Sequence, residues 1–233
     1  MKIIKNEKLI KRNGVIGQWT SIIALVILGG GMYMTFANPT NPQLIYYSLG
    51  SLAVGFILTQ IGMYMGNRWG RSPRPDEKLD AGLKGLQNEF SIYHFMTPAS
   101  HLLVGPAGVW VLIPYRQRGL VTYEKNRWRV GGGGFLQAYM SIFGQEGIGR
   151  PDLEAEGEIS AVRKLLAKSL DEHEFPNVQA ALIFMNELVD LQAEDAPLPA
   201  LKLKQLKDFI RQRAKERPIS QTQLAAVKAA LPE

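Results

Sequence analysis

The chain has 233 residues, no cysteine and a formal net charge of +6 at pH 7. The absence of cysteine excludes disulfides, thiolate zinc sites, iron–sulfur clusters and a cysteine nucleophile. The positive charge gathers at residues 1–15 and 67–80, beside apolar segments, while the rest of the chain is close to electrical balance. The basic composition therefore indicates a membrane flank more than a nucleic-acid surface.

Two apolar segments lie close to the N-terminus, at about residues 16–37 and 44–66. No Asp, Glu, Lys or Arg occurs between Arg12 and Arg68, and each segment exceeds the roughly 20 residues that cross a hydrocarbon core as a helix. A cleaved signal peptide would have a shorter apolar region, about 7–15 residues long, and no second span directly after it. The sequence predicts two transmembrane helices, with aromatic residues near their ends as at membrane interfaces: Trp19, Tyr33, Tyr46, Tyr47, Tyr64 and Trp69.

The polar turn at residues 38–43 predicts that the two helices form an antiparallel hairpin. Lys and Arg are frequent on both outer flanks and absent from the turn. By the positive-inside rule, we expect a multi-pass cell-membrane protein with both termini in the cytoplasm. The second span carries Ser51 and Gly55, then Gly62 and Gly66, at the spacing of small residues that allow close helix packing. A homo-oligomer formed through the transmembrane helices is one hypothesis that this pattern leaves open.

Residues 67–75 form a basic, Pro-rich linker, and residues 76–233 have the patterning of a cytoplasmic globular domain. The apolar run at 109–113 predicts a central, buried strand. The Gly-rich segment at 131–134 is expected to be a flexible connection, because no lysine follows it as in a phosphate-binding loop. The remaining predicted elements give a mixed sheet flanked by helices: helices at 76–90, 151–170, 201–215 and after the N-cap Ser220, and strands at 91–96, 101–104, 120–124, 127–130 and 178–185.

One segment resembles a known family. The sequence His101-Leu-Leu-Val-Gly-Pro-Ala-Gly-Val-Trp-Val-Leu-Ile113, followed by Gly119 and Trp128, resembles the nuclease-related domain (NERD) family of the PD-(D/E)XK nuclease-like superfamily. The order of the following elements fits as well, so the resemblance extends over 76–233. It implies a restriction-endonuclease-like α/β fold. In that superfamily two carboxylates hold Mg²⁺ and a lysine orients or activates water, which is the chemistry that oxygen ligands and a metal-bound water supply.

The chain departs from this family pattern at each position that would carry the chemistry. Ser100 stands where the resemblance implies the first acid, Pro114 where it implies the second, and Arg116 where it implies the lysine. A proline side chain has no ligand atom, and arginine stays protonated and cannot act as a base. We therefore expect no catalytic residue, no metal site and no cofactor. Mg²⁺ enters only under the alternative of a divergent nuclease whose site has moved to acids such as Asp80 or Glu124.

The histidines give no metal-ligand pattern. His94 and His173 have no acidic residue or histidine at ligand spacing along the sequence. His101, at the start of a strand, is expected to form an ordinary hydrogen bond. The acids between Glu154 and Glu158 are expected to form the polar face and the N-terminal charge of their helix.

A basic cluster beside three aromatic residues is the predicted binding surface. It combines cations for phosphates with rings for base stacking, although a solvated hairpin face or a contact with anionic lipid headgroups would show the same pattern. The cations are Arg116, Arg118, Lys125, Arg127 and Arg129, and the aromatic residues are Tyr115, Tyr123 and Trp128.

Together these features predict a membrane-anchored, nuclease-like domain that is catalytically inactive and acts as a binding or scaffold module. Its expected partners are the lipid bilayer and, weakly, nucleic acid or anionic lipid, with the protein partner left open. Two alternatives come from other classes: a divergent metal-dependent nuclease with a relocated site, and an accessory subunit of a membrane complex.

Overall fold

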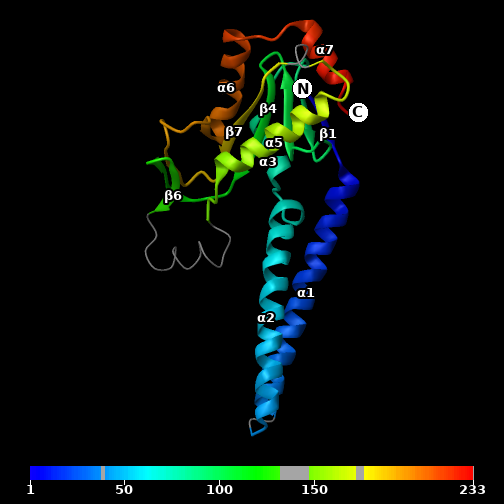
Figure 1. The fold of residues 1–233 in the computed structure, drawn as a ribbon, viewed down its shortest axis with the longest axis vertical. Coiled ribbons are helices and arrows are strands. Elements are labelled where there is room, and N and C mark those ends of the chain that lie inside the picture. Colours follow the sequence, from blue (N-terminus) through cyan, green and yellow to red (C-terminus); the bar gives the residue numbers. More distant parts are fainter. Residues whose placement is uncertain (38–39, 132–146, 172–175, 233) are drawn as a thin grey trace. The chain divides into compact units, whose positions relative to one another are not determined.

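The computed structural model describes residues 1–37, 40–131, 147–171 and 176–232. The chain divides into two compact units, one comprising Met1–Asn6 with Pro75–Glu233 and the other comprising Glu7–Arg74. The first unit therefore contains residues from both sides of the apolar segment (Figure 1). In sequence terms, the apolar segment is an insertion into the α/β domain, between residues 6 and 75.

The inserted unit consists of α1 (Glu7–Ala37), α2 (Pro42–Met65) and a short π-helical segment, η1 (Gly66–Gly70). Asn41 caps α2, because its side chain accepts a hydrogen bond from the backbone N–H of Gln43 at 3.0 Å. Both helices are long and apolar enough to cross a membrane, and only 11% and 6% of their most apolar stretches are buried within the structure. A core helix of a globular domain would bury most of such a stretch, so this observation separates α1 and α2 from core helices.

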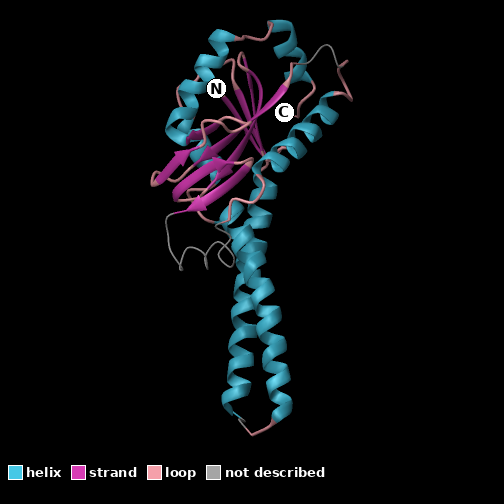
Figure 2. Cartoon of the chain, turned by 60° about the vertical axis from the view of Figure 1, so that its left-hand side comes forward, coloured by secondary structure: helices cyan, strands magenta, loops and turns pink. Residues whose placement is uncertain are grey.

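Small residues pack α1 against α2, which lie side by side in Figures 1 and 2. The buried residues of α1 recur every seventh position: Ile10, Gly17, Ala24 and Gly31. A side chain added at Gly31 would overlap Ser51, and one at Gly62 would overlap Ser21. Of the small residues that the sequence marked for helix packing, Ser51, Gly55 and Gly62 thus contact the other helix of the same chain, whereas a side chain at Gly66 would meet no neighbour among the described residues. The homo-oligomer stays a prediction.

The domain contains a six-stranded mixed sheet and a separate three-stranded sheet (Figure 2). In the large sheet, β1 is parallel to β2, the pairs β2–β3 and β3–β4 are antiparallel, and β4, β7 and β9 are parallel. In spatial order its strands are β1 (Lys2–Lys5), β2 (Ser91–His94), β3 (His101–Gly105), β4 (Gly108–Tyr115), β7 (Val178–Phe184) and β9 (Ala200–Lys202). The small sheet has the order β6 (Arg127–Gly131), β5 (Gly119–Glu124) and β8 (Val189–Gln192).

Helices cover both faces of the large sheet, so the prediction of a mixed sheet flanked by helices is confirmed. On one face, α5 (Pro151–Leu166) and α7 (Gln221–Ala229) bury the side chains of Val109 and Val111. On the other, α3 (Pro75–Gly82) and α6 (Leu203–Glu216) bury Trp110 and Leu112. Because successive side chains of a strand point to opposite faces, a strand covered on both faces needs a continuous apolar run. The expectation that 109–113 is a central, buried strand is therefore confirmed.

Several element boundaries differ from the expected ones. The helix predicted at 76–90 ends at Gly82, and Gly85 adopts a φ of +88°, which a helix does not allow. Leu83, Leu86 and Phe90 are nevertheless buried, because the turns that follow α3 carry them into the same core. The helix predicted at 151–170 ends at Leu166.

At the C-terminal end, α6 begins at Leu203 because residues 200–202 belong to β9. The expected cap of α7 is confirmed, since Ser220 Oγ accepts a hydrogen bond from the backbone N–H of Gln223 at 3.1 Å. Two features predicted from the sequence, the glycines at 132–134 and His173, lie outside the described residues.

Candidate functional site

The most distinctive residues of the family resemblance form a tight turn. Gly105 and Gly108 pair across the β3–β4 hairpin, with Pro106 and Ala107 as its two-residue turn. Gly108 has a φ of +99°, and a side chain at Gly105 would overlap the ring of Phe90. Both glycines are thus explained by backbone geometry and close packing. The motif that carries the resemblance describes the fold of this segment and contributes no chemical group.

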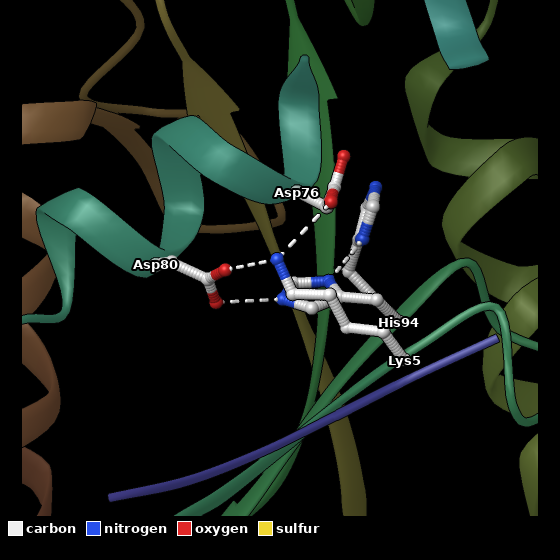
Figure 3. A network of polar contacts seen from close by, with 5 residues as sticks. Lys5, Asp76, Asp80 and His94 are labelled. Carbon is white, nitrogen blue, oxygen red and sulfur yellow. Dashed lines mark hydrogen bonds and ion pairs between the residues drawn. The ribbon is translucent and has the colours of Figure 1, made fainter. Parts of the chain in front are cut away.

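Beside this sheet lies a network that the sequence did not predict, which we call the Lys–Asp–His network (Figure 3). Its members come from four elements: Lys5 from β1, Asp76 and Asp80 from α3, His94 from β2 and His101 from β3. The i, i+4 spacing of the two aspartates places them on one face of α3.

Lys5 joins the two aspartates. Its Nζ lies 2.5 Å from Asp80 Oδ2 and 3.2 Å from Asp76 Oδ2. Burial by itself lowers the pKa of the Lys5 ammonium, but the hydrogen bonds and negative charges of Asp80 and Asp76 outweigh this effect and raise the pKa above its ordinary value. Lys5 lies two residues before α1, and Asp76 is the second residue of α3, where the chain re-enters the domain. The ion pairs therefore connect the last residues before the apolar segment with the first residues after it.

The histidines extend the network into the core. His94 Nε2 lies 2.9 Å from Asp80 Oδ1, and His94 Nδ1 lies 2.7 Å from His101 Nδ1. The antiparallel register of β2 and β3 pairs His94 with His101, which places the two rings on the same face. The expectation that His101 makes an ordinary hydrogen bond is confirmed. The inference from sequence spacing that His94 has no acidic or histidine neighbour is wrong, because the folded chain brings Asp80 and His101 next to it.

Burial decides what the Lys–Asp–His network does chemically. The side chain of His94 is fully buried and His101 is 1% exposed, while Asp80 and Lys5 retain 16% and 21% exposure. The imidazoles are therefore enclosed by protein, so the network holds protons and charges in place instead of presenting them to a substrate. Among the described residues, no group of three or more His, Asp or Glu side chains has a geometry that could hold a metal ion.

The three positions that the family resemblance assigns to catalysis lie in or directly beside strands of the large sheet. Ser100 Oγ donates a hydrogen bond to Glu158 Oε1 of α5 at 3.2 Å. Pro114 lies in β4 beyond the last residue that pairs with β3, so its missing N–H removes no hydrogen bond on that side. Arg116 directly follows β4. The pyrrolidine ring of Pro114 offers no ligand atom and the guanidinium of Arg116 is a cation, so neither fits a Mg²⁺ site; the Ser100 hydroxyl alone supplies none of the negative charge that carboxylates bring to this ion.

The acids at the start of α5 lie in its first turn, and Glu154 and Glu156 are exposed, as expected for a polar face; two of the acids also accept hydrogen bonds from aromatic residues of the sheets. Tyr115 donates its hydroxyl to Glu154 Oε2 at 2.6 Å, and the indole N–H of Trp128 donates to Asp152 Oδ1 at 3.1 Å. Burial and the Glu154 carboxylate raise the pKa of the Tyr115 hydroxyl. These bonds satisfy the polar tips of two aromatic side chains that are otherwise buried.

The predicted basic cluster is spread along the small sheet. Arg118 precedes β5 and Lys125 follows it, so the six-residue strand separates these two cations by about 20 Å. Arg127 and Arg129 alternate with the buried Trp128 on β6 and are exposed. Arg127 also faces Glu124 across the β5–β6 pair, which dilutes the positive charge.

The aromatic part of the predicted binding surface is not accessible as expected. Tyr115 is 7% exposed and Trp128 is 9% exposed, and both belong to the core. Tyr123 packs against Trp128, with ring centroids 5.1 Å apart. Stacking of bases on Tyr115 or Trp128 would require these rings to leave the core, so the half-buried Tyr123 and the cations are the parts of the predicted surface that stay accessible.

In comparisons with known proteins, no protein-family model, no curated protein and no solved structure matches the chain.

Proposed function

We propose that the protein is a membrane-anchored, nuclease-like domain that acts by binding and carries out no metal-dependent cleavage. The observation that carries this proposal is the insertion of the apolar helices between β1 and α3. A hairpin whose two ends enter one domain anchors that domain at two points. Attachment at two points keeps the domain at the membrane, which suits a module that binds a partner there.

Several features of the α/β domain support a nuclease-like fold with a lost site. The β3–β4 hairpin with its Gly-Pro-Ala-Gly turn, followed by α5, β7 and the terminal helices, has the element order that the resemblance leads one to expect. The positions that would hold metal carry Ser100, Pro114 and Arg116. Asp80, one of the acids considered for a relocated site, already has one oxygen on Lys5 and the other on His94. A divergent nuclease would have to dismantle that arrangement.

The proposed topology has both termini in the cytoplasm. It rests on the absence of Lys and Arg from the α1–α2 turn and on their abundance at the opposite ends of the helices. The pairing of β1 with β2 adds an independent argument: residues before the first span and after the second belong to one sheet, so they must lie on the same side of the membrane.

Cysteine labelling tests this topology directly, because the chain contains no native cysteine. We expect a membrane-impermeant maleimide to label Thr40→Cys, in the α1–α2 turn, in intact cells. Asp208→Cys, on an exposed position of α6, should react only after lysis, and its reaction with the denatured protein serves as the labelling control. Reaction of Asp208→Cys in intact cells would place the domain outside and contradict the proposal.

Binding of phosphate-bearing ligands through the small sheet is the second testable part. We expect the full chain in neutral-lipid nanodiscs to bind a labelled single-stranded oligonucleotide weakly, with an affinity that falls as salt rises. Replacing Arg127 and Arg129 by alanine should lower the magnitude of the log–log salt slope by about 1.4, since each phosphate contact to a single strand contributes about 0.7.

A matched double variant controls for net charge in this binding experiment. Arg211→Ala with Arg213→Ala removes the same charge from α6, where Arg213 pairs with Glu216. Fluorescence anisotropy at several salt concentrations should show an unchanged slope for this control. Equal losses in both double variants would show that the β5–β6 arginines contribute only to the overall charge.

A further inference from the structure

We infer that the Lys–Asp–His network is a proton-sensitive latch that holds β1, the strand leading into α1, on the edge of the large sheet. The inference is independent of any ligand of the small sheet. It starts from one distance, the 2.7 Å between His94 Nδ1 and His101 Nδ1, and from the burial of both rings.

The distance limits how many protons the two rings can hold. Two imidazoles have four ring nitrogens and accept four protons when both are fully charged. A separation of 2.7 Å between the Nδ1 atoms leaves room for one hydrogen, with one nitrogen donating and the other accepting. The His94–His101 pair in this geometry therefore holds three protons at most. A fourth proton would set two N–H groups head to head inside the core.

Charged groups of the network lie next to the rings, and one further carboxylate lies on the other face of the sheet. Asp80 accepts from His94 Nε2 and binds Lys5, and Asp76 binds Lys5 from the same helix. On the other face of the sheet, Glu158 of α5 receives the hydroxyl of Ser100, the neighbour of His101. These charges do not remove the steric exclusion of the fourth proton, which follows from the distance between the two Nδ1 atoms.

Opening of the pair would act on β1 through shared atoms. His94 and Lys5 both use the carboxylate of Asp80, and they are also register partners in the parallel β1–β2 ladder. The backbone N–H of Asn6 donates to the carbonyl of His94 at 3.1 Å, directly before α1 begins. The strand β1 has four residues and pairs with β2 alone. A displacement of His94 therefore loosens the end of this edge strand that leads into α1, while its other end stays held by the hydrogen bond of the Lys2 N–H to the Phe90 carbonyl.

The direction of the pH effect follows from the proton count. Histidines released from the network take up both remaining protons as the pH falls below the ordinary histidine value of about 6.5. In the closed geometry, the His94–His101 pair has room for the third proton but not for the fourth. The open form thus binds one more proton, and acid favours opening by up to tenfold per pH unit. The expected window ends near pH 4, where free aspartates begin to protonate.

Hydrogen exchange of the full chain in nanodiscs measures this opening. After correction for intrinsic exchange rates, the opening constant of the backbone amides of residues 2–6 should rise about tenfold per unit between pH 6 and 4.5. The variant His101→Asn cannot take a proton and should flatten the dependence, while His173→Asn should keep it. A pH-independent opening constant in the native chain, or an unchanged slope in His101→Asn, would overturn the inference.

A second measurement, a nuclear magnetic resonance count of the protonated ring nitrogens, leaves His94 and His101 unsubstituted. In His173→Asn the only histidines are those of the network, so selective ¹⁵N labelling gives four ring-nitrogen signals. At pH 5, with the amides of β1 still protected, we expect three protonated nitrogens and one bare nitrogen. Four protonated nitrogens in the closed state would refute the latch even if His101→Asn failed to fold.

Discussion

Replacing Asp80 by alanine should destabilise the α/β domain by up to about 3 kcal/mol, the lower end of the cost of removing one partner from a buried ion pair, because Asp80 and Lys5 are only partly buried. The carboxylate is only 16% exposed and binds two groups, Lys5 Nζ at 2.5 Å and His94 Nε2 at 2.9 Å. Its removal leaves the buried N–H of His94 without this acceptor and leaves Lys5 with Asp76 alone. The variant Asp80→Asn should lose less stability than Asp80→Ala, because the amide oxygen can still accept a hydrogen bond from His94.

Urea unfolding of the full chain in detergent micelles measures this loss, since the micelle protects α1 and α2 and the transition then reports the α/β domain. Asp208→Ala is the matched control: its partner Arg211 lies 3.8 Å away, and both side chains are largely exposed. Exposed ion pairs contribute little to stability. Equal midpoints for the two alanine variants would mean that the network does not stabilise the domain.

The sequence contained enough information for the central part of the domain. The run from Val109 to Ile113 is apolar at every position, and only a strand covered on both faces requires that pattern. The apolar spans were equally clear, because a charge-free interval of that length is incompatible with a hydrated surface. In both cases the signal lies within one continuous segment of the chain.

The strand β1 could not be predicted in the same way. It has four residues with a lysine at each end, and it precedes an apolar span, where lysines are also typical of a membrane flank. Only its pairing with β2, almost ninety positions later, makes it a strand. Short edge strands are determined by the sheet that they join, and their own composition carries little information.

The Lys–Asp–His network shows the same limit for a site. Lys5 and Asp76 are 71 positions apart, and His94 and Asp80 are 14 apart. No fixed spacing describes such a set, because its geometry comes from the register of β1, β2 and β3 with α3 above them. The basic cluster shows the reverse case: Arg118 and Lys125 are close in sequence, yet β5 separates them in space.

The resemblance to nucleases leads to the last prediction: the purified chain should not cleave single- or double-stranded DNA or RNA with Mg²⁺ or Mn²⁺. Ser100, Pro114 and Arg116 stand where the resemblance implies two metal-binding acids and a lysine. Each lost group should raise the barrier by several kcal/mol, and each 1.36 kcal/mol lowers the rate tenfold. The three losses together should put cleavage below detection.

Time courses with labelled substrates, carried to many hours at high protein concentration, test this expectation. The control for contaminating nucleases is the variant pair Asp80→Asn and Glu124→Gln, analysed beside the native chain from parallel purifications. Cleavage that is equal in all three preparations comes from a contaminant. Metal-dependent cleavage that disappears in either variant would show that the site has moved, because Asp80 would then exchange its bonds to Lys5 and His94 for a metal ion. In that case Asp80→Asn should also weaken Mn²⁺ binding measured calorimetrically, an effect that loss of the ion pairs alone would not produce.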